Sequence, residues 1–473
     1  MNKNLFHKLS IIIFSFSILI EIQIHAQYPE YYCKTGVDGY GTETNAIKVV
    51  SSKNGNVYAI INQDMTGTKW GKKTGIDFLT MCIYPDSTLN TTCVPKWSKY
   101  YNTNEDDIAL DIAVDDQENI YVVGNSVTFK EGNEALREVV IIKYNAQGKL
   151  IWSKKYDSDY SGLNAKIALT EDNKIYLVYT RSGPIESIGE LCIINIDSQA
   201  NKIFTYKYPK TIMNPEYLKC DKNGNLYITG KDYDKMKVIK CSAKGDLMWV
   251  NSIDNDGNQS KQTVNYNNKS YAIEIGDGIG KYIIAQDEYI YVSGEAIIYG
   301  MTKQQSALFI LQYSNEGNLI WSQFIVGDGY DEGNNVSTGM VMDSYGNIIV
   351  SGIVRNSSSS DLVLTKFSNT GTEIWRQYYP EIKDGTSYQN LLDIEVLDNL
   401  YVSAISDNGI VNLKYNSSGE NVGSVTIQNS KAEFYGKLNY LCVAKNNSCF
   451  IAGSLERNGK MSAYLINNKF VEH

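Results

Sequence analysis

The chain has 473 residues, of which 43% are hydrophobic and 21% are charged, and its formal net charge is −9. These values are typical of a globular protein and exclude a disordered chain. The acidic balance and the small number of arginines make a nucleic-acid partner unexpected. The three histidines are His7, His25 and His473. If the first two are removed with an N-terminal signal, the last residue carries the only remaining imidazole. We therefore expect neither a His-activated nucleophile nor a His-based metal or haem site, and no cofactor.

Residues 1–26 have the pattern of an export signal. Lys3 and Lys8 precede the apolar run Leu9–Ile20, and Ala26 stands before a plausible cleavage point at Gln27. The run is too short to span a bilayer, and an N-terminal membrane anchor is the alternative. A lipid anchor is not expected, because it requires a cysteine directly after the cleavage point and Gln27 stands there instead. We therefore predict a secreted, periplasmic or cell-surface protein, monomeric and without an integral membrane segment.

The eight cysteines all follow the predicted signal, which permits disulfide bonds in an exported protein. Their spacing forms neither a CxxC pair nor a zinc-like cluster. Cys82 and Cys93 flank one hairpin loop and are the most plausible bridge. Four others lie within apolar strand patterns and are expected to be small buried residues: Cys192, Cys220, Cys241 and Cys442.

One short motif recurs eight times, and internal repeats of this length decide the fold. Each copy has a polar turn, often ending in Asn, then an aliphatic residue and an aromatic or apolar anchor. The anchors are separated by about 50–65 residues, and they are Tyr58, Tyr121, Tyr176, Tyr227, Tyr291, Ile349, Tyr401 and Phe450.

A second landmark follows most anchors, in which an apolar residue stands eight positions before a Trp or Phe. Five units share this spacing: Tyr144 with Trp152, Ile196 with Phe204, Cys241 with Trp249, Tyr313 with Trp321, and Phe367 with Trp375. The first unit has Tyr84 and Trp97 with a longer loop, and the seventh has Gly423 at the Trp position. Because the aromatic residues recur at the same places, we expect them to form the core between units.

In chain order, the second unit predicts strands at Leu110–Asp115, Ile120–Gly124, Val139–Tyr144 and Leu150–Tyr156. These short runs are rich in Val, Ile and Tyr, and turn residues bound them. Repeated four-stranded units predict an all-β propeller spanning residues 27–473 as one domain. A β-solenoid and a string of sandwich domains are the alternatives.

The number of units predicts eight blades, with seven as the alternative. The last unit lacks a fourth strand, and Tyr31–Lys34 near the N-terminus resembles the missing one. We therefore expect the N-terminal strand to complete the last blade, because closure leaves no open sheet edge.

The units resemble the secreted bacterial β-propeller repeats of the SBBP type, best at Ile120–Trp152 and at Gly346–Trp375. That pattern is a Gly-Asn-aliphatic-Tyr strand followed by a Tyr-Asn-x-x-Gly turn and Trp. The resemblance covers nearly all of residues 30–470; it implies the fold far more than a function, and the family name implies seven blades. The turn-to-Trp hairpin also resembles the tryptophan-docking repeat of eight-bladed quinoprotein dehydrogenases. Those enzymes carry adjacent cysteines, which this chain lacks, so no quinone cofactor is expected.

The length variation among the units lies in the second-to-third-strand loops and in the connections between blades, which share one face. Long loops on a rigid scaffold commonly bind ligands, and Trp and Tyr stack on sugar rings or anchor protein contacts. Candidate binding residues on this face are Trp70, Tyr266, Asn267 and Tyr271. The alternative is that these loops only pack on the neighbouring blade.

Asp111 and Asp393 lie on predicted innermost strands and are candidate channel carboxylates. They could bind a cation or act as an acid/base pair, and the alternative is a solvated channel wall. Two functions follow. The first is an exported, non-catalytic propeller that binds a glycan or protein partner on the long-loop face. The second is a glycan-active hydrolase or lyase that uses Asp, Glu and Tyr.

Overall fold

The computed structural model describes 33 strands, and the described residues contain no helix. The described residues are 43–65, 75–83, 95–103, 105–129, 135–156, 164–182, 189–209, 214–232, 235–253, 261–266, 269–286, 288–300, 305–327, 335–355, 359–382, 387–395, 397–406, 409–427, 436–445, 447–457 and 460–469. Within them, no apolar helix of membrane-spanning length occurs.

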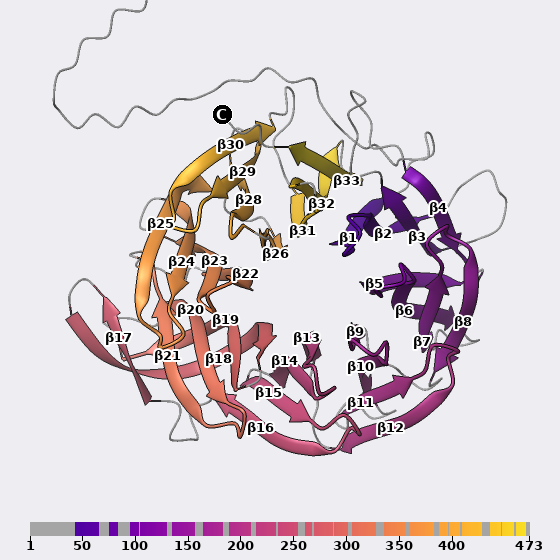
Figure 1. Ribbon diagram of the computed structural model, residues 1–473, viewed down its shortest axis with the longest axis horizontal. Helices are drawn as coiled ribbons and strands as arrows, with labels where there is room; N and C mark the ends of the chain where they lie inside the picture. The colour runs from indigo at the N-terminus through magenta and orange to yellow at the C-terminus, as the bar shows by residue number, and fades with distance from the viewer. Residues whose placement is uncertain are drawn as a thin grey trace, which may run out of the picture.

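The strands form eight four-stranded blades arranged in a ring, with one strand of each blade at the central channel (Figure 1). The first half of the ring contains blade 1 (β1 Thr44–Ser51, β2 Val57–Asp64, β3 Ile76–Ile83, β4 Pro95–Tyr101), blade 2 (β5 Asp106–Val114, β6 Ile120–Phe129, β7 Ala135–Tyr144, β8 Leu150–Tyr156), blade 3 (β9 Lys166–Leu169, β10 Ile175–Ser182, β11 Gly189–Ile196, β12 Lys202–Pro209) and blade 4 (β13 Asn214–Cys220, β14 Leu226–Asp232, β15 Lys235–Cys241, β16 Leu247–Ile253).

The second half contains blade 5 (β18 Lys269–Ala285, β19 Tyr289–Tyr299, β20 Gln305–Ser314, β21 Leu319–Ile325, with β17 Lys261–Tyr266 added), blade 6 (β22 Val336–Met342, β23 Ile348–Arg355, β24 Ser360–Phe367, β25 Glu373–Ile382), blade 7 (β27 Leu392–Ile394, β28 Leu400–Ser406, β29 Gly409–Tyr415, β30 Asn421–Ile427) and blade 8 (β26 Ser387–Asn390, β31 Gly436–Val443, β32 Ser448–Arg457, β33 Lys460–Lys469). The predicted all-β propeller with eight blades is confirmed.

Blade 8 is built differently from the others, because its four-stranded sheet includes β26 from the connection between blades 6 and 7. This strand pairs in parallel with β31, through Ser387 with Lys437 and Tyr388 with Leu438. The remaining pairs, β31 with β32 and β32 with β33, are antiparallel. The predicted closing strand Tyr31–Lys34 lies outside the described residues.

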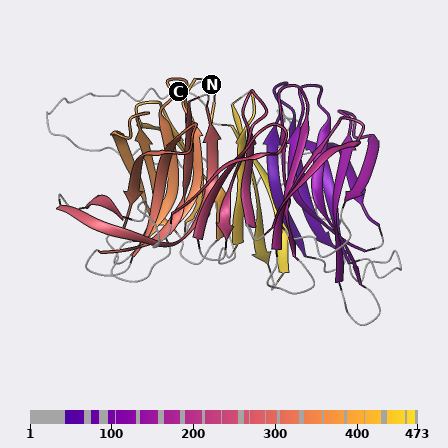
Figure 2. The same cartoon turned by 90° about the horizontal axis from the view of Figure 1, so that it is seen from below.

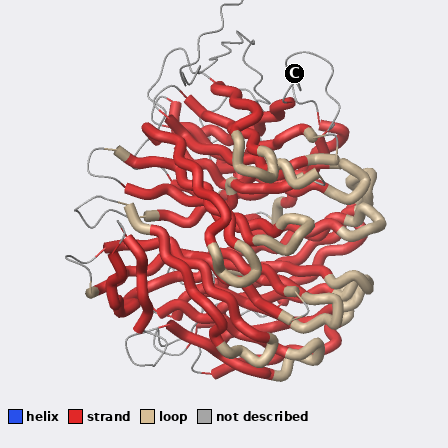
Figure 3. Tube along the Cα trace, turned by 60° about the vertical axis from the view of Figure 1, so that its left-hand side comes forward, coloured by secondary structure: helices blue, strands red, loops and turns tan. Residues whose placement is uncertain are grey.

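The turns between the first and second strands, and between the third and fourth, gather on one face of the ring, which we call the tight-turn face (Figures 2 and 3). Because consecutive strands are antiparallel, successive connections alternate between this face and the opposite one. Blade 5 adds a hairpin, β17 with the first part of β18, which projects from the ring (Figure 2). The sequence indicates an insertion here without predicting the hairpin.

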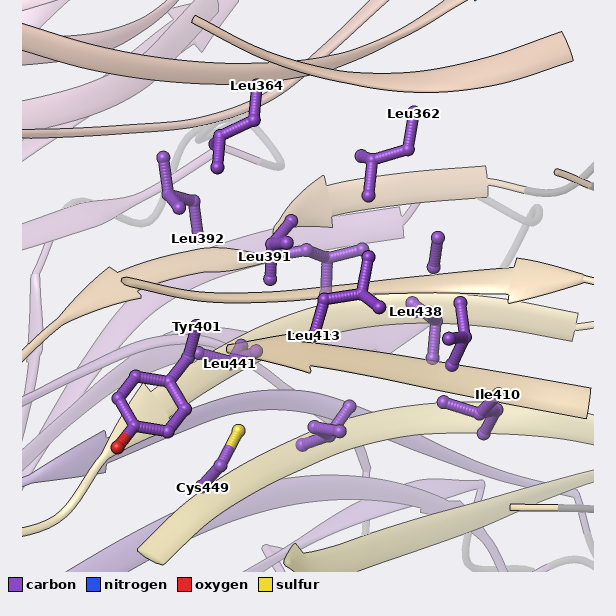
Figure 4. Close-up of a cluster of buried hydrophobic side chains, with 14 of the residues drawn as sticks. Leu362, Leu364, Leu391, Leu392, Tyr401, Ile410, Leu413, Leu438, Leu441 and Cys449 are labelled. Carbon is purple, nitrogen blue, oxygen red and sulfur yellow. The ribbon is translucent and has the colours of Figure 1, made fainter. Parts of the chain in front are cut away.

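The core consists of apolar layers between neighbouring blades, because each blade buries both faces of its middle strands. One layer joins blades 6, 7 and 8 and includes Leu364, Tyr401, Leu413 and Cys449 (Figure 4). Burial on both faces explains why the middle strands read as nearly continuous apolar runs. It also confirms the expected burial of Cys192, Cys241 and Cys442, whereas Cys220 is half-buried.

The repeated Trp attaches five of the blades, blades 1, 2, 4, 5 and 6, to the next one. Its indole Nε1 donates a hydrogen bond to a carbonyl in the next blade's third-to-fourth-strand turn, at 2.9–3.3 Å. The donor–acceptor pairs are Trp97–Ala146, Trp152–Ser198, Trp249–Asn315, Trp321–Asn369 and Trp375–Ser417. The anchor tyrosines are at most 2% exposed. The predicted role of both aromatic positions as core between blades is confirmed.

Candidate functional site

Each blade has one residue, in its innermost strand or directly before it, that pairs with the residue two positions after the anchor on the neighbouring strand. In six of these strands it directly follows a β-bulge, which locally re-aims a side chain. We call this set the channel ring: Lys48, Asp111, Lys166, Tyr217, Tyr282, Gly339, Leu391 and Tyr440. Each member of the channel ring stands ten residues before its anchor, except Tyr282 in blade 5, which stands nine residues before Tyr291. This spacing is the sequence signal that identifies the channel ring.

Several members of the channel ring converge across blade boundaries. Lys48 Nζ lies 2.6 Å from Asp111 Oδ1 and 4.9 Å from the centre of the Tyr440 ring. Burial alone would lower the pKa of Lys48, but the nearby Asp111 and Tyr440 raise it above its usual value. Tyr217 packs edge-on against Tyr282, with ring centres 6.1 Å apart. Lys48 and Asp111 therefore neutralise each other in the interior of the ring.

The tyrosines of the channel ring are not poised as bases. Burial raises the pKa of Tyr217 and of Tyr282, and the neighbouring Tyr440 raises both further. A phenol whose pKa lies above its usual value stays protonated at neutral pH. The arrangement is suited to hydrogen bonding and packing rather than to proton abstraction.

The two candidate channel carboxylates both bind backbone amides across a blade boundary. Asp111 Oδ2 accepts a hydrogen bond from Ile167 N in blade 3 at 3.0 Å, and Asp393 Oδ2 accepts one from Val443 N in blade 8 at 2.7 Å. Burial raises the pKa of Asp393 to about 6. The two carboxylates therefore accept hydrogen bonds from different strands. Among the described residues, no group of three His, Cys, Asp or Glu side chains is arranged to hold a metal ion.

A hollow of about 430 Å³ lies at the outer edge of the ring, between blades 1 and 2. Tyr144 is 3% exposed and forms its floor, whereas Tyr100 is 43% exposed and Leu150 is 49% exposed at its sides. The complete lining is Lys99, Tyr100, Tyr101, Tyr144, Gln147, Gly148, Lys149 and Leu150. Tyr100 is the exposed tyrosine of the lining and offers its ring to a ligand, while its hydroxyl donates to Gln63 Oε1 at 2.9 Å.

The tyrosine four residues after the aromatic position is arranged differently in blade 1 than in blades 2 and 3. Tyr156 donates its hydroxyl to Ala200 O in the next blade at 3.0 Å, and Tyr208 donates to Gly245 O. The equivalent residue in blade 1 is Tyr101, which stacks on Phe78 with ring centres 5.1 Å apart. In blades 4 and 5 this position is Ile253 and Ile325.

Two buried carboxyl groups lie close to the hollow, at the start of β3 and β5. Asp77 is 1% exposed; its Oδ2 accepts a hydrogen bond from Asn102 at 2.7 Å, and its Oδ1 has no hydrogen-bond partner among the described residues. Burial, together with the charge of Asp107, raises the pKa of Asp77 to about 7. Burial also raises the pKa of Asp107, although hydrogen bonds from Thr103 oppose the shift. Burial raises the pKa of Tyr100, and the charge of Asp77 raises it further.

The predicted binding residues are only partly described. Trp70 and Asn267 lie outside the described residues. The backbones of Tyr266 and Tyr271 lie on the projecting hairpin, where Val264 pairs with Tyr271 and Tyr266 pairs with Lys269. Cys82 is buried in β3, and Cys93 lies outside the described residues, so their bridge stays a prediction.

Sequence reasoning missed the carboxylate that supports several anchor tyrosines. Asp115 accepts hydrogen bonds from Asn119 N at 2.8 Å and from the Tyr121 hydroxyl at 3.1 Å. Asp221 does the same with Asn225 and Tyr227. The constant spacing, Asp four residues before Asn and six before Tyr, is a signal that could have found it. The Asn and the Tyr that donate to each carboxylate lie within six residues of it, so these hydrogen bonds stabilise the turn and the start of the next strand.

Comparison with known proteins agrees with the fold. Residues 96–126 match the family described as SBBP, beta-propeller repeat, and no curated protein matches the chain. The Dos1 propeller is 9% identical with a TM-score of 0.50, over 94% of this chain and 96% of that one.

Two further solved structures are similar over less of the chain. The polysaccharide lyase Uly1 is 11% identical with a TM-score of 0.42, over 76% of this chain and 90% of that one. The β-propeller domain of the Trilobed protease from Pyrococcus furiosus is 10% identical with a TM-score of 0.37, over 77% of this chain and 95% of that one. At these identities the likeness concerns the fold alone. The resemblance to the SBBP repeat is confirmed by the family match.

Proposed function

We propose that the protein is an exported, non-catalytic β-propeller that binds a glycan in the hollow between blades 1 and 2. The observation that carries the proposal is the lining of the hollow, with three tyrosines and one exposed leucine around a volume of about 430 Å³. Pyranose rings present apolar faces and a rim of hydroxyls, which match tyrosine rings and their hydroxyl groups. The predicted signal at residues 1–26 supports export.

The test compares the wild-type protein with Tyr100→Ala on a glycan array, followed by calorimetry on the glycans that bind. Tyr100 is 43% exposed, so its truncation removes contact area without opening the core. We expect affinity to fall about tenfold or more, as for a central aromatic contact. Tyr378→Ala is the matched control, because Tyr378 is 50% exposed and stands at the same position after its Trp in blade 6. Equal affinities of wild type and Tyr100→Ala would contradict the proposal.

A glycan-active enzyme is the second candidate, favoured by the raised pKa values of Asp77 and Asp107 next to the hollow. A carboxyl group with a pKa near 7 can donate a proton at neutral pH. The test measures new reducing ends and unsaturated products from each bound glycan, with Asp77→Asn as the variant. Turnover by the wild type that Asp77→Asn abolishes would favour the enzyme over the binding protein.

The long-loop face, with Trp70, Tyr266, Asn267 and Tyr271, remains the alternative location for glycan or protein binding. It is tested by trimming residues 258–275 and repeating the array and a pull-down. Binding lost on trimming and retained in Tyr100→Ala would assign the ligand to this face instead of the hollow.

A further inference from the structure

The hollow carries positive charge on a chain that is acidic as a whole. The chain has 53 acidic and 44 basic residues other than His, yet the lining of the hollow contains Lys99 and Lys149 and no Asp or Glu. Both lysines are exposed. Among the residues that line the hollow, the charge balance is therefore opposite in sign to that of the whole chain, although the buried Asp77 and Asp107 lie nearby.

These two lysines also differ from others on blades 1 and 2 in having no internal partner. Lys155 Nζ lies 2.9 Å from Glu138, and Lys53 Nζ lies 2.7 Å from Asp116. Within the described part of the chain, neither Lys99 nor Lys149 makes an ion pair or a side-chain hydrogen bond. Their ammonium groups keep their full charge and donor capacity for a ligand.

We infer that the hollow selects anionic saccharides, bearing a carboxylate or a sulfate, through Lys99 and Lys149. This rests on the proposed glycan-binding function. Tyr100 and the half-buried Tyr101 contact the sugar rings, and the two ammonium groups bind the anionic substituents. Because both lysines are exposed, their attraction is screened by salt and contributes to selectivity more than to total affinity.

The test measures binding of three hexasaccharides to the purified protein by calorimetry: α-1,4-galacturonate, sulfated chondroitin and neutral cellohexaose. We expect the anionic ligands to bind more tightly than the neutral one. In Lys99→Gln/Lys149→Gln, their affinity should fall about tenfold, while the neutral affinity stays unchanged. The two anionic arms distinguish carboxylate from sulfate recognition.

Lys154→Gln/Lys202→Gln is the matched control. Lys154 stands two residues after Trp152, as Lys99 does after Trp97, and Lys202 follows the turn of blade 3 near the position of Lys149 in blade 2. This control removes the same charge and should leave the ratio of anionic to neutral affinity unchanged. An unchanged ratio in Lys99→Gln/Lys149→Gln, with neutral binding retained, would overturn the inference and leave glycan binding intact. Failure of all three hexasaccharides to bind the wild type would refute both proposals.

Discussion

Gly371→Ala should destabilise the protein much more than Gly346→Ala, although both glycines belong to blade 6. Both have a φ of +80°, so any L-residue at either position costs about 1 kcal/mol of backbone strain. They differ in surroundings. A Cβ at Gly371 would lie 2.7 Å from Cδ2 of Trp321, whereas a Cβ at Gly346 would meet no atom within 4 Å.

The additional cost at Gly371 comes from the docked indole. Carbon atoms pack best at about 3.5–4.0 Å, so the Trp321 ring must move by about 1 Å. That movement weakens its 3.1 Å hydrogen bond to Asn369 O, worth about 1 kcal/mol, and forces repacking that costs about 1–2 kcal/mol. We therefore expect about 1 kcal/mol for Gly346→Ala and about 3 kcal/mol for Gly371→Ala.

The assay is urea denaturation followed by tryptophan fluorescence and far-ultraviolet circular dichroism at fixed pH. The control is the background Trp321→Ala, in which the added methyl group no longer meets a ring. There the cost of Gly371→Ala should fall to that of Gly346→Ala. Equal shifts of the midpoint for the two glycine variants in the wild-type background would refute the docking argument.

Two further predictions concern buried charges. Lys48→Met should destabilise the protein by about 3 kcal/mol, because it leaves the Asp111 carboxylate buried without its cation. Lys53→Met should leave the stability nearly unchanged, because the Lys53–Asp116 pair is exposed. Equal destabilisation by the two variants in thermal denaturation would contradict the neutralising role of the Lys48–Asp111 pair. The pKa of Asp77 is about 7 in the folded protein, against an ordinary value of 3.8. Between these pH values the folded state binds more protons than the unfolded state. The contribution of protonated Asp77 to stability is therefore lost as pH rises from about 4 to 7. Asp77→Asn should flatten this pH dependence by up to about 4 kcal/mol, and exposed Asp116→Asn should leave it unchanged. A pH profile for Asp77→Asn parallel to that of the wild type would show that Asp77 does not titrate in this range.

The repeated parts of the fold could be predicted from the sequence because most blades carry the same anchor and five of them dock the same Trp on the next blade. The fourth strand of blade 2 is Leu150–Tyr156, as predicted, since its Trp and its turn mark both ends. The first strand was predicted at Leu110–Asp115 but extends over Asp106–Val114. A bulge between Ala109 and Asp111 shifts the register there, and it interrupts the alternation on which a strand prediction depends.

The candidate sites were harder to predict, because they depend on contacts between residues far apart in the chain. Asp111 was identified on an innermost strand, but its partner Lys48 is 63 residues away and belongs to another repeat. The hollow is lined by residues of two blades, Lys99–Tyr101 of blade 1 and Tyr144 with Gln147–Leu150 of blade 2, and no local pattern specifies that they meet. In contrast, the turn carboxylates Asp115 and Asp221 have a constant spacing and were within reach of sequence analysis.

The departures from the repeat are the places where a function separate from stability should lie. Residues present in nearly every blade, such as the docked Trp and the anchor Tyr, serve the closed ring and are needed whatever the protein binds. In the hollow, Tyr101 packs against the core shared by blades 1 and 2, so its replacement would disturb the ring as well as the recess. Tyr100 is 43% exposed, so its replacement should change binding and leave the packing between blades intact. A site that uses exposed residues of an outermost strand therefore separates binding from folding.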